Sequence, residues 1–462
     1  MKNRKEKDSL GSITVPANAY YGSHTSRSLS NFPISGQTNH YSLIKAVVTI
    51  KKAAALVNLK LGLLDEKKSK AIITACNEIL SGKFTDQFVV DVYQAGAGTS
   101  LNMNVNEVIA NRANELLGAK LGSYKFIHPN DHVNMSQSTN DVVPTALRIA
   151  ILGELPKLTK SLNELSKALT GKSKEFSKIV KTGRTHLQDA LPLTLGHEFG
   201  AYAKAIEKDI MRIKRVSNSF YEIGIGGTAV GTGVNSHPRY HRLMVQELKT
   251  ITKLPLRSSG NLFESMQNAE DFLDLSSSFR TLSQTLIRIG NDLRLLSSGP
   301  KTGFAEITLP AVQPGSSIMP GKVNPSIIEM LTMVCFQVIG YDQAILLASQ
   351  AGQLELNVFY PLIGHNLLEQ MKLLTNAINV FTKKCVTGIK ANKEMSDFWL
   401  QRSSGIAAVL NPYFGFAKTA QLVKESLKTG KSVKELAIKK GLISPQQSEE
   451  IFNITHLTTP QK

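Results

Sequence analysis

The sequence predicts a mainly α-helical protein built around a central bundle of long helices. Over long stretches, apolar residues recur at alternating spacings of four and three, which places them on one face of a helix. The clearest stripe holds Leu275, Phe279, Leu282, Leu286, Ile289, Leu293 and Leu296, and similar stripes run from Leu147 to Leu169 and from Phe199 to Phe220. Helices of about 25 to 35 residues are about 40 to 50 Å long and pack side by side as a bundle.

The length and composition predict a soluble globular protein with two or three structural units. The chain has 462 residues, of which 42% are hydrophobic and 19% charged. A single hydrophobic core stops growing near about 250 to 300 residues. No run of about 18 consecutive apolar residues occurs, so we expect no membrane span. The first residues, MKNRKEKDSLG, are polar and charged; we interpret them as a frayed tail and not as a secretion signal.

Cysteine content and charge indicate the cellular compartment of the protein and the kinds of partner it can bind. Cys76, Cys335 and Cys385 lie far apart without CxxC spacing, which argues against a disulfide framework or a zinc site and indicates a reduced, cytoplasmic protein. The formal net charge is +18, yet the lysines are scattered and no nucleic-acid recognition motif occurs. We therefore expect a solvated basic surface and no nucleic-acid partner.

Three glycine-rich loops interrupt the helical pattern. They span Gly96 to Thr99, Gly224 to Gly233, and Gly315 to Gly321. Glycine lets the backbone approach a ligand closely and adopt positive φ, so these loops are candidates for anion-binding amides. Each loop taken alone is also compatible with a simple turn.

The third loop continues into SSIMPGKVNP, which combines hydroxyl, cationic and amide groups. Ser316 and Ser317 precede Lys322 and Asn324, just before a helix that we expect to begin near Pro325. Such a loop can gather amides and a positive charge around a carboxylate or a developing oxyanion. The alternative interpretation is a polar turn before a helix.

Three further strings carry polar groups that suit a small charged substrate. They place Thr185 and His186 in GRTHLQDALPLTLG; Ser138, Thr139 and Asn140 in HPNDHVNMSQSTND; and Thr99, Ser100 and Asn102 in GAGTSLNMNVNE. Histidine can carry a proton near neutral pH or act as a structural anchor, and Ser/Thr/Asn clusters also build turns. None of these strings has metal-ligand spacing.

Taken together, the four strings resemble the active-site segments of the fumarase/aspartase superfamily. GSSIMPGKVNP resembles its signature, and the other three strings follow in the order expected for that family. The likeness extends from about Gly11 through NPYFGF near Asn411, so it covers nearly the whole chain. It implies a three-domain fold: a mostly helical domain over 1–141, the long-helix bundle over 142–393, and a small helical domain over 394–462. It also implies a homotetramer whose active sites are shared among three subunits.

Within the superfamily, most of the distinguishing residues resemble aspartases. VPANAYYGSHTSRS, the GAGTS string, Thr139 and AGQLELNV resemble that branch, whereas His128, NFPISG and LTMVC resemble fumarases. The resemblance implies a reversible anti elimination of ammonia from L-aspartate, which gives fumarate. Fumarate hydratase is the alternative from the same superfamily, and a non-catalytic homologue or a basic nucleic-acid binder are alternatives from other classes.

The resemblance also implies roles for individual residues. The expected catalytic residues are Ser316, His186 and Lys322. Ser316 would remove the Cβ proton to give an aci-carboxylate, with Lys322 as a nearby cation. The residues expected to hold the substrate are Thr99, Ser100, Ser138, Thr139, Asn140, Thr185, His186, Lys322 and Asn324, with Glu329 orienting His186. We expect no organic cofactor, while activation by a divalent cation stays open. Ser136 stands where many members carry glycine, and Tyr341 where many carry asparagine.

Overall fold

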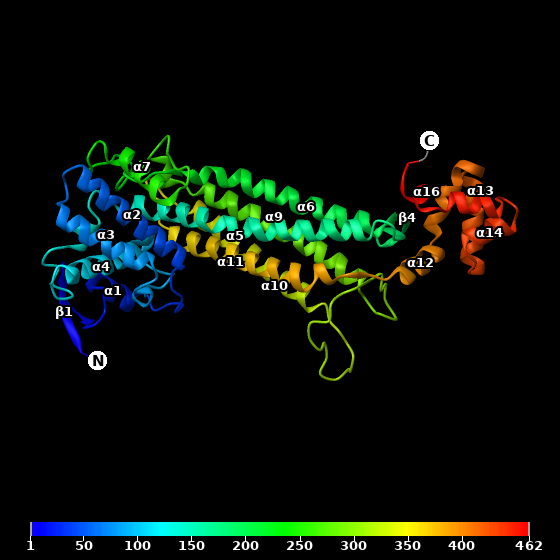
Figure 1. The fold of residues 1–462 in the computed structure, drawn as a ribbon, viewed down its shortest axis with the longest axis horizontal. Coiled ribbons are helices and arrows are strands. Elements are labelled where there is room, and N and C mark those ends of the chain that lie inside the picture. Colours follow the sequence, from blue (N-terminus) through cyan, green and yellow to red (C-terminus); the bar gives the residue numbers. More distant parts are fainter. Residues whose placement is uncertain (1, 461–462) are drawn as a thin grey trace. The chain divides into compact units, whose positions relative to one another are not determined.

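The computed structural model describes residues 2–460 (Figure 1). The chain forms two compact units, each assembled from three stretches. Unit 1 contains Met1–Thr159, Met211–Thr281 and Gln337–Leu374, and unit 2 contains Lys160–Ile210, Leu282–Phe336 and Thr375–Lys462. The three-domain boundaries at 141 and 393 stay a prediction.

Long helices dominate the chain, as the apolar stripes predict. They are α5 (Thr139–Glu175), α6 (Leu195–Val216), α9 (Glu270–Leu296), α10 (Ser326–Gln350) and α11 (Tyr360–Lys384). The stripe from Leu275 to Leu296 lies within α9, and all its members are buried. The stripe from Phe199 is shorter than predicted, because α6 ends at Val216 and Phe220 lies in the following 3-10 turn.

Unit 1 combines bundle helices with shorter helices. The shorter ones are α1 (Ser23–Asn31), α2 (Tyr41–Lys60), α3 (Glu66–Leu80), α4 (Thr99–Leu116), α7 (Tyr240–Thr252) and α8 (Glu264–Gln267), and α2 packs against α3, α4 and α7. A buried polar contact links three long helices. Ser276 of α9 donates to Asp342 of α10 at 2.7 Å, and Gln370 of α11 donates to Ser276 at 3.1 Å. Burying these groups is tolerated because they are hydrogen-bonded to one another.

The interpretation of the first residues as a frayed tail is wrong. Strand β1 (Asn3–Asp8) pairs with β2 (Gly11–Pro16) in an antiparallel hairpin. Side chains alternate across a strand, so Arg4 and Glu6 share one face. Glu6 is 5% exposed, lies 2.7 Å from Arg4 and accepts the Ser23 N–H at 3.0 Å. These partners allow a charged segment to be ordered against the rest of unit 1.

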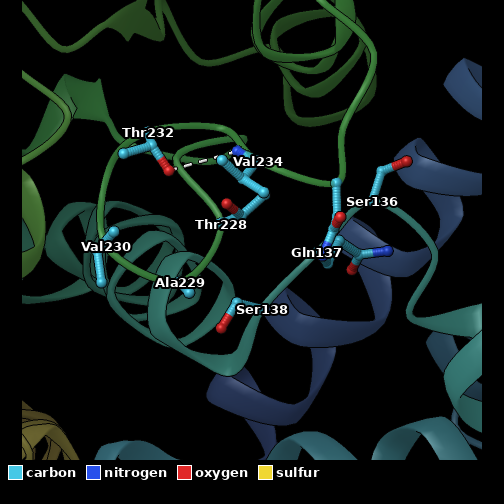
Figure 2. A pocket seen from close by; sticks show the side chains of 9 residues that line it. Ser136, Gln137, Ser138, Thr228, Ala229, Val230, Thr232 and Val234 are labelled. Atoms are coloured by element: carbon cyan, nitrogen blue, oxygen red, sulfur yellow. Dashed lines mark hydrogen bonds between the residues drawn. The ribbon is translucent and has the colours of Figure 1, made fainter.

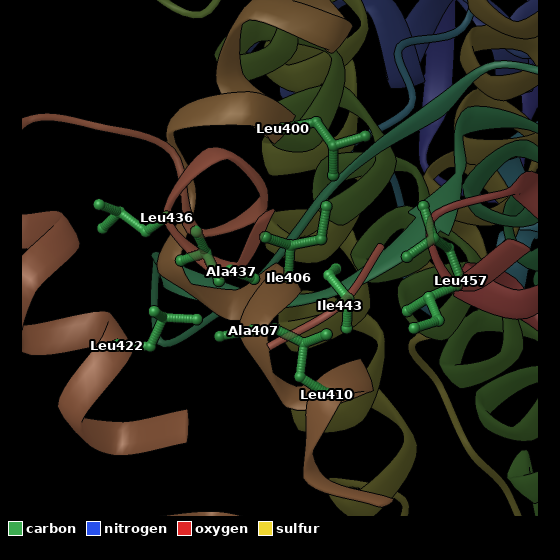
Figure 3. Packing of buried hydrophobic residues seen from close by; sticks show 11 residues of the cluster. Leu400, Ile406, Ala407, Leu410, Leu422, Leu436, Ala437, Ile443 and Leu457 are labelled. Carbon is green, nitrogen blue, oxygen red and sulfur yellow. The ribbon is translucent and has the colours of Figure 1, made fainter. Parts of the chain in front are cut away.

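Unit 2 carries a hairpin and a group of short C-terminal helices. The hairpin joins β3 (Val180–Thr185) to β4 (Gln188–Thr194). The short helices are α12 (Lys393–Arg402), α13 (Asn411–Thr429), α14 (Val433–Lys439), α15 (Pro445–Ile451) and α16 (Ile454–Thr458). They share a separate cluster of buried apolar residues that includes Leu400, Leu410, Leu422, Leu436 and Leu457 (Figure 3). The prediction of shorter elements after about Asn392 is therefore confirmed.

Two further pairs of two-residue strands occur within residues 2–460. In unit 1, β5 (Glu222–Ile223) pairs in parallel with β6 (Arg257–Ser258). In unit 2, β7 (Ile307–Thr308) pairs antiparallel with β8 (Lys390–Ala391). Sheet is thus confined to short ladders, and the fold class is mainly α.

Helix α10 is more apolar than the composition of the whole chain suggests. Within the described residues, it is the one helix long and apolar enough to cross a membrane, and 28% of its most apolar stretch is buried. Core helices of soluble bundles meet the same criterion of length and composition. Met333, Phe336 and Leu347 share one face by helical spacing and are at least 60% exposed in the single chain.

Candidate active site

The predicted site residues belong to both units. Unit 1 contains Thr99, Ser100, Ser138, Thr139 and Asn140, and unit 2 contains Thr185, His186, Ser316, Lys322, Asn324 and Glu329. Each set is built by a different kind of local structure.

In unit 1, a tight glycine turn positions the start of α4. Ala97 and Gly98 have φ of +60° and +91°, and α4 begins at Thr99. A Cβ on Gly98 would lie 3.0 Å from Val143, so glycine suits both the conformation and the close packing. Thr99 is half-buried, with its hydroxyl 3.4 Å from the Gly96 carbonyl. Ser100 is 1% exposed, and its Oγ has no hydrogen-bond partner within residues 2–460.

The segment Ser138–Asn140 leads into the first turn of α5 and contacts both α4 and the second glycine-rich loop. Asn102 Nδ2 donates to Thr139 Oγ1 at 3.0 Å. Asn140 Nδ2 donates to the Ala229 carbonyl at 2.8 Å, and the Asn140 N–H donates to Ser138 Oγ at 3.2 Å. The structure therefore connects the α4 start, Ser138–Asn140 and the loop at Gly224–Gly233 within one unit.

A pocket opens between Ser138 and this glycine-rich loop (Figure 2). Its volume is about 330 Å³, and its lining residues are Ser136, Gln137, Ser138, Thr228, Ala229, Val230, Thr232, Val234 and Asn235. The loop residues from Thr228 to Asn235 were not among the predicted site residues. The signal for them was the cluster of glycines in GIGGTAVGTG, which indicated a ligand-binding loop but did not identify its side chains.

Asp141 holds the two sides of this pocket together. Its carboxylate accepts backbone N–H groups from Ser138 at 3.0 Å, Gly226 at 2.8 Å and Thr228 at 3.0 Å. Asp141 is 1% exposed. Burial raises its pKa to about 6, and the three N–H donors act in the opposite direction by favouring the carboxylate. Asp141 thus links the backbone of Ser138 to that of the glycine-rich loop.

The structure gives a physical account of Ser136. This residue has φ of +63°, a left-handed conformation that favours glycine. Its Oγ donates to Asn58 Oδ1 at 3.2 Å, which fixes the side chain against α2. Glycine in other members of the superfamily fits the same backbone without strain. Nothing in the structure explains Tyr341.

In unit 2, the loop that carries Ser316 is closed at its neck. The Gly315 N–H donates to the Lys322 carbonyl at 2.8 Å, and Asn324 Nδ2 donates to the Gly315 carbonyl at 2.6 Å. A Cβ on Gly315 would lie 2.5 Å from the Lys322 oxygen. A side chain at position 315 would clash with this oxygen. Glycine therefore allows the backbone of residue 315 to approach that of Lys322, and this contact closes the loop between Gly315 and Asn324.

Inside the loop, Ser316 Oγ accepts two backbone hydrogen bonds. The donors are the N–H groups of Ile318 at 3.2 Å and Met319 at 2.9 Å. Amide donors directed at an oxygen favour its anionic form. Lys322 is exposed on the same loop. The loop therefore supplies the amides that an alkoxide at Ser316 requires.

Thr185 and His186 lie at the tip of the β3–β4 hairpin. Thr185 pairs with Gln188, and the two residues between them, His186 and Leu187, have φ of +54° and +59°. Positive φ at both central positions is the geometry of a type I′ turn, whose twist matches that of the flanking strands. The Thr185 and His186 side chains are exposed.

An ionic cluster anchors this hairpin. Arg184 and Lys181 of β3 lie 2.9 Å and 3.1 Å from the carboxylate of Glu306, which is completely buried. Lys181 also contacts Glu198 at 2.8 Å. Burial raises the pKa of Glu198, and the charge of Lys181 opposes that shift. A buried carboxylate between two cations fixes the strand that ends at Thr185.

Glu329 lies in the first turn of α10 and is half-buried. Its orientation of His186 stays a prediction. Within residues 2–460, no group of three or more His, Cys, Asp or Glu side chains lies close enough together to hold a metal ion. That the reaction uses no organic cofactor stays a prediction.

Comparison with known proteins places this arrangement in a family. A family model described as Lyase matches residues 11–340, and a model described as Fumarase C C-terminus matches residues 406–459. The chain belongs to the fumarase/aspartase family of lyases. The predicted resemblance and fold class are therefore confirmed.

Relatives of this lyase include proteins named for both reactions. An aspartate ammonia-lyase from Bacillus sp is 47% identical, over 99% of this chain and 98% of the relative. A class II fumarate hydratase from Bradyrhizobium diazoefficiens is 45% identical, over 99% of this chain and 97% of the relative. The crystal structure of a fumarate lyase:delta crystallin from Brucella melitensis bound to cobalt is 46% identical, with a TM-score of 0.97, covering 99% of this chain and 100% of that one.

Proposed function

We propose that this lyase is an aspartate ammonia-lyase, which converts L-aspartate reversibly into fumarate and ammonia. The pair of backbone N–H groups directed at Ser316 Oγ, at 3.2 Å and 2.9 Å, supports the elimination chemistry, and the relatives named aspartate ammonia-lyase favour ammonia as the leaving group. A serine hydroxyl is too weak a base to remove a carbon-bound proton unless its alkoxide is stabilised. The closed loop supplies that stabilisation, with Lys322 as an additional positive charge.

In the proposed reaction, Ser316 acts as the base in an anti elimination. The alkoxide takes the proton from Cβ of aspartate, and the electron pair of the C–H bond moves into the adjacent carboxylate as an aci-carboxylate. The pair then forms the carbon–carbon double bond while the C–N bond breaks and ammonia leaves. Donors that meet the charge of the intermediate lower the barrier, because that charge is absent from the substrate.

The remaining site residues are assigned to binding. Thr185 and His186 would hold the carboxylate beside the reacting carbon, with His186 oriented by Glu329, and Lys322 and Asn324 would hold the substrate carboxylates. Thr99, Ser100, Ser138, Thr139 and Asn140 would surround the amino group and the other carboxylate. This reaction needs no organic cofactor.

Fumarate hydratase is the second candidate, because one relative carries that name. His128, a residue that favours this alternative in the sequence, has a structural role here. Its Nδ1 accepts the N–H groups of Asn130 and Asp131 at 3.3 Å each and caps the turn Pro129–Val133. It therefore adds no support for hydration over ammonia elimination.

The ultraviolet absorbance of fumarate separates the two functions. Purified protein is given aspartate and malate at equal concentrations, and the formation of fumarate is followed. We expect fumarate from aspartate and little from malate. The reverse preference would assign the chain as a fumarase, and no product from either substrate would contradict both.

We also infer a homotetramer with shared active sites. The exposed apolar face of α10, formed by Met333, Phe336 and Leu347, supports subunit contacts, because apolar stripes of this kind are covered in assembled proteins. Mass measurement in solution tests the assembly. Mixing inactive Ser316→Ala and His186→Ala subunits, with exchange by mild denaturation, should restore activity at sites that receive both native residues. Failure to recover activity would contradict shared sites.

A further inference from the structure

Lys51 of α2 is a buried lysine that the proposed reaction does not use. Its relative exposure is 0%, and its Nζ donates to Asn134 Oδ1 at 2.8 Å and Gln137 Oε1 at 2.9 Å. A buried amine is costly unless its hydrogen bonds are satisfied. Both acceptors belong to the loop that leads directly into Ser138, so the amine is directed at the candidate site and not at a distant part of the core.

Asn134 connects this amine to the substrate-binding segment. Its Oδ1 accepts from Asn102 Nδ2 and Asn106 Nδ2, each at 3.2 Å, in addition to Lys51. Asn102 Nδ2 also donates to Thr139 Oγ1 at 3.0 Å. One oxygen thus collects donors from α2 and α4, and one of those donors contacts a predicted substrate ligand.

Gln137 connects Lys51 to the pocket by a second route. Its Nε2 donates to the Val133 and Met135 carbonyls at 3.1 Å and 3.0 Å, while its Oε1 accepts from Lys51. Gln137 lines the pocket beside Ser138 (Figure 2). The Lys51 contact is the hydrogen bond that ties this amide to α2, because the other two lie within the loop itself.

We propose that Lys51 is a positioning residue that holds Ser138–Asn140 in its substrate-binding geometry through Asn134 and Gln137. This inference rests on the proposed function, in which those residues bind the amino dicarboxylate. Lys51 does not contact the substrate. Its loss would let the loop shift relative to α4 and would weaken binding, while the base at Ser316 remains intact.

A matched pair of variants tests the role of the amine. Methionine and glutamine each end one atom short of Nζ, but only glutamine keeps an N–H donor. Lys51→Met should raise KM for aspartate about tenfold, equivalent to about 1.4 kcal/mol of binding, with kcat within about threefold. Lys51→Gln should recover part of that loss. Lys52→Met removes a neighbouring charge from the same helix and should leave KM unchanged.

The outcomes separate positioning from general stability. A Lys51→Met enzyme with a lower Tm but an unchanged KM would overturn the proposal, as would equal KM values for the methionine and glutamine variants. Should Lys51→Met fail to fold, Asn102→Leu interrupts the same connection at Thr139 and must raise KM in the same way, and an unchanged KM there counts against the proposal.

Binding of succinate, a non-reacting dicarboxylate, keeps this test distinct from the test of function. Calorimetry on the assembled enzyme should show about tenfold weaker binding for Lys51→Met than for the wild type. A wild-type enzyme that turns over neither aspartate nor malate and does not bind succinate contradicts the proposed function. A wild-type enzyme that binds succinate no better than Lys51→Met contradicts only the role of Lys51.

Discussion

The two sets of candidate site residues are held in place by opposite means. In unit 1, the Ser138–Asn140 segment rests on completely or nearly completely buried groups, Lys51 and Asp141, which bond to the loops around it. In unit 2, the Ser316 loop is exposed over most of its length and is closed only by backbone and amide contacts at Gly315. In the proposed reaction, the fixed Ser138–Asn140 segment, called the platform below, would bind the substrate, and the weakly anchored loop would present the base.

The comparison predicts that changes that remove or displace Ser316 reduce kcat, whereas changes in the platform raise KM. Interactions present only in the transition state affect kcat, whereas uniform binding affects KM. The following variants test that division, from the largest expected effect to the smallest.

Ser316→Ala should have the largest effect. Removal of the base should lower kcat about a thousandfold, within the range of general-base contributions. Succinate binding, measured by calorimetry, should change little because the carboxylate ligands remain. Ser317→Ala, next to it on the loop, is the control. Retained turnover in Ser316→Ala would remove the assignment of the base.

Glu306→Gln should destabilise the protein by about 3 to 5 kcal/mol. The substitution removes the buried counter-charge of Arg184 and one of the two carboxylates that contact Lys181. Chemical denaturation measures this loss. Glu207→Gln, which breaks an exposed pair with Lys204, should cost less than about 1 kcal/mol. Equal effects of the two variants would show that the hairpin is not anchored by the buried cluster.

Gly315→Ala should open the neck of the Ser316 loop. The added Cβ would lie 2.5 Å from the Lys322 oxygen and 2.7 Å from the Asn324 nitrogen, so one of the two must move. A displacement of this size should lower kcat about tenfold to a hundredfold while Tm stays nearly constant. Steady-state kinetics and thermal unfolding give both values. A rise in KM without a fall in kcat would mean that the loop contributes to substrate binding, as the platform does.

Lys51 should leave a signature in the pH dependence of stability. Burial lowers its pKa from 10.5 to about 7, with Asp141 and Cys76 as the charged or ionisable neighbours that oppose the shift. Between those values the unfolded chain binds a proton that folded Lys51 does not. Stability therefore rises with pH over this range. The stability of the wild type relative to Lys51→Met should increase from pH 7 to about pH 9, as measured by urea denaturation; a flat difference would mean that Lys51 stays charged.

The long helices were predictable because their signal is repeated many times. Each residue from Leu275 to Leu296 in the stripe of α9 adds to the same periodicity, and all are buried. The hairpin of β1 and β2 was not predictable in this way, because its order depends on partners such as Ser23 that are distant in sequence. The order of residues in a segment shows its periodicity. It does not show which charged side chains form ion pairs or hydrogen bonds with residues elsewhere in the chain.

The site was predictable in part for the same reason. Ser316 and its neighbours form one continuous string, and the amides that contact Ser316 lie two and three residues away. Lys51 gave no such signal, because IKKAAALV does not distinguish it from Lys52, and its partners lie more than 80 residues further along the chain. The left-handed backbone of Ser136 is likewise visible only in the folded chain.

At the turn formed by His186 and Leu187, a substitution that raises the thermal stability of the enzyme would also loosen the position of the His186 side chain. Leucine seldom adopts positive φ, so Leu187 at +59° stores conformational energy that a Leu187→Gly substitution would release. A thermostability screen would favour that substitution. It would also give the imidazole a wider arc of motion, and the gain in heat tolerance would then be accompanied by a less well aimed side chain at the tip of the hairpin.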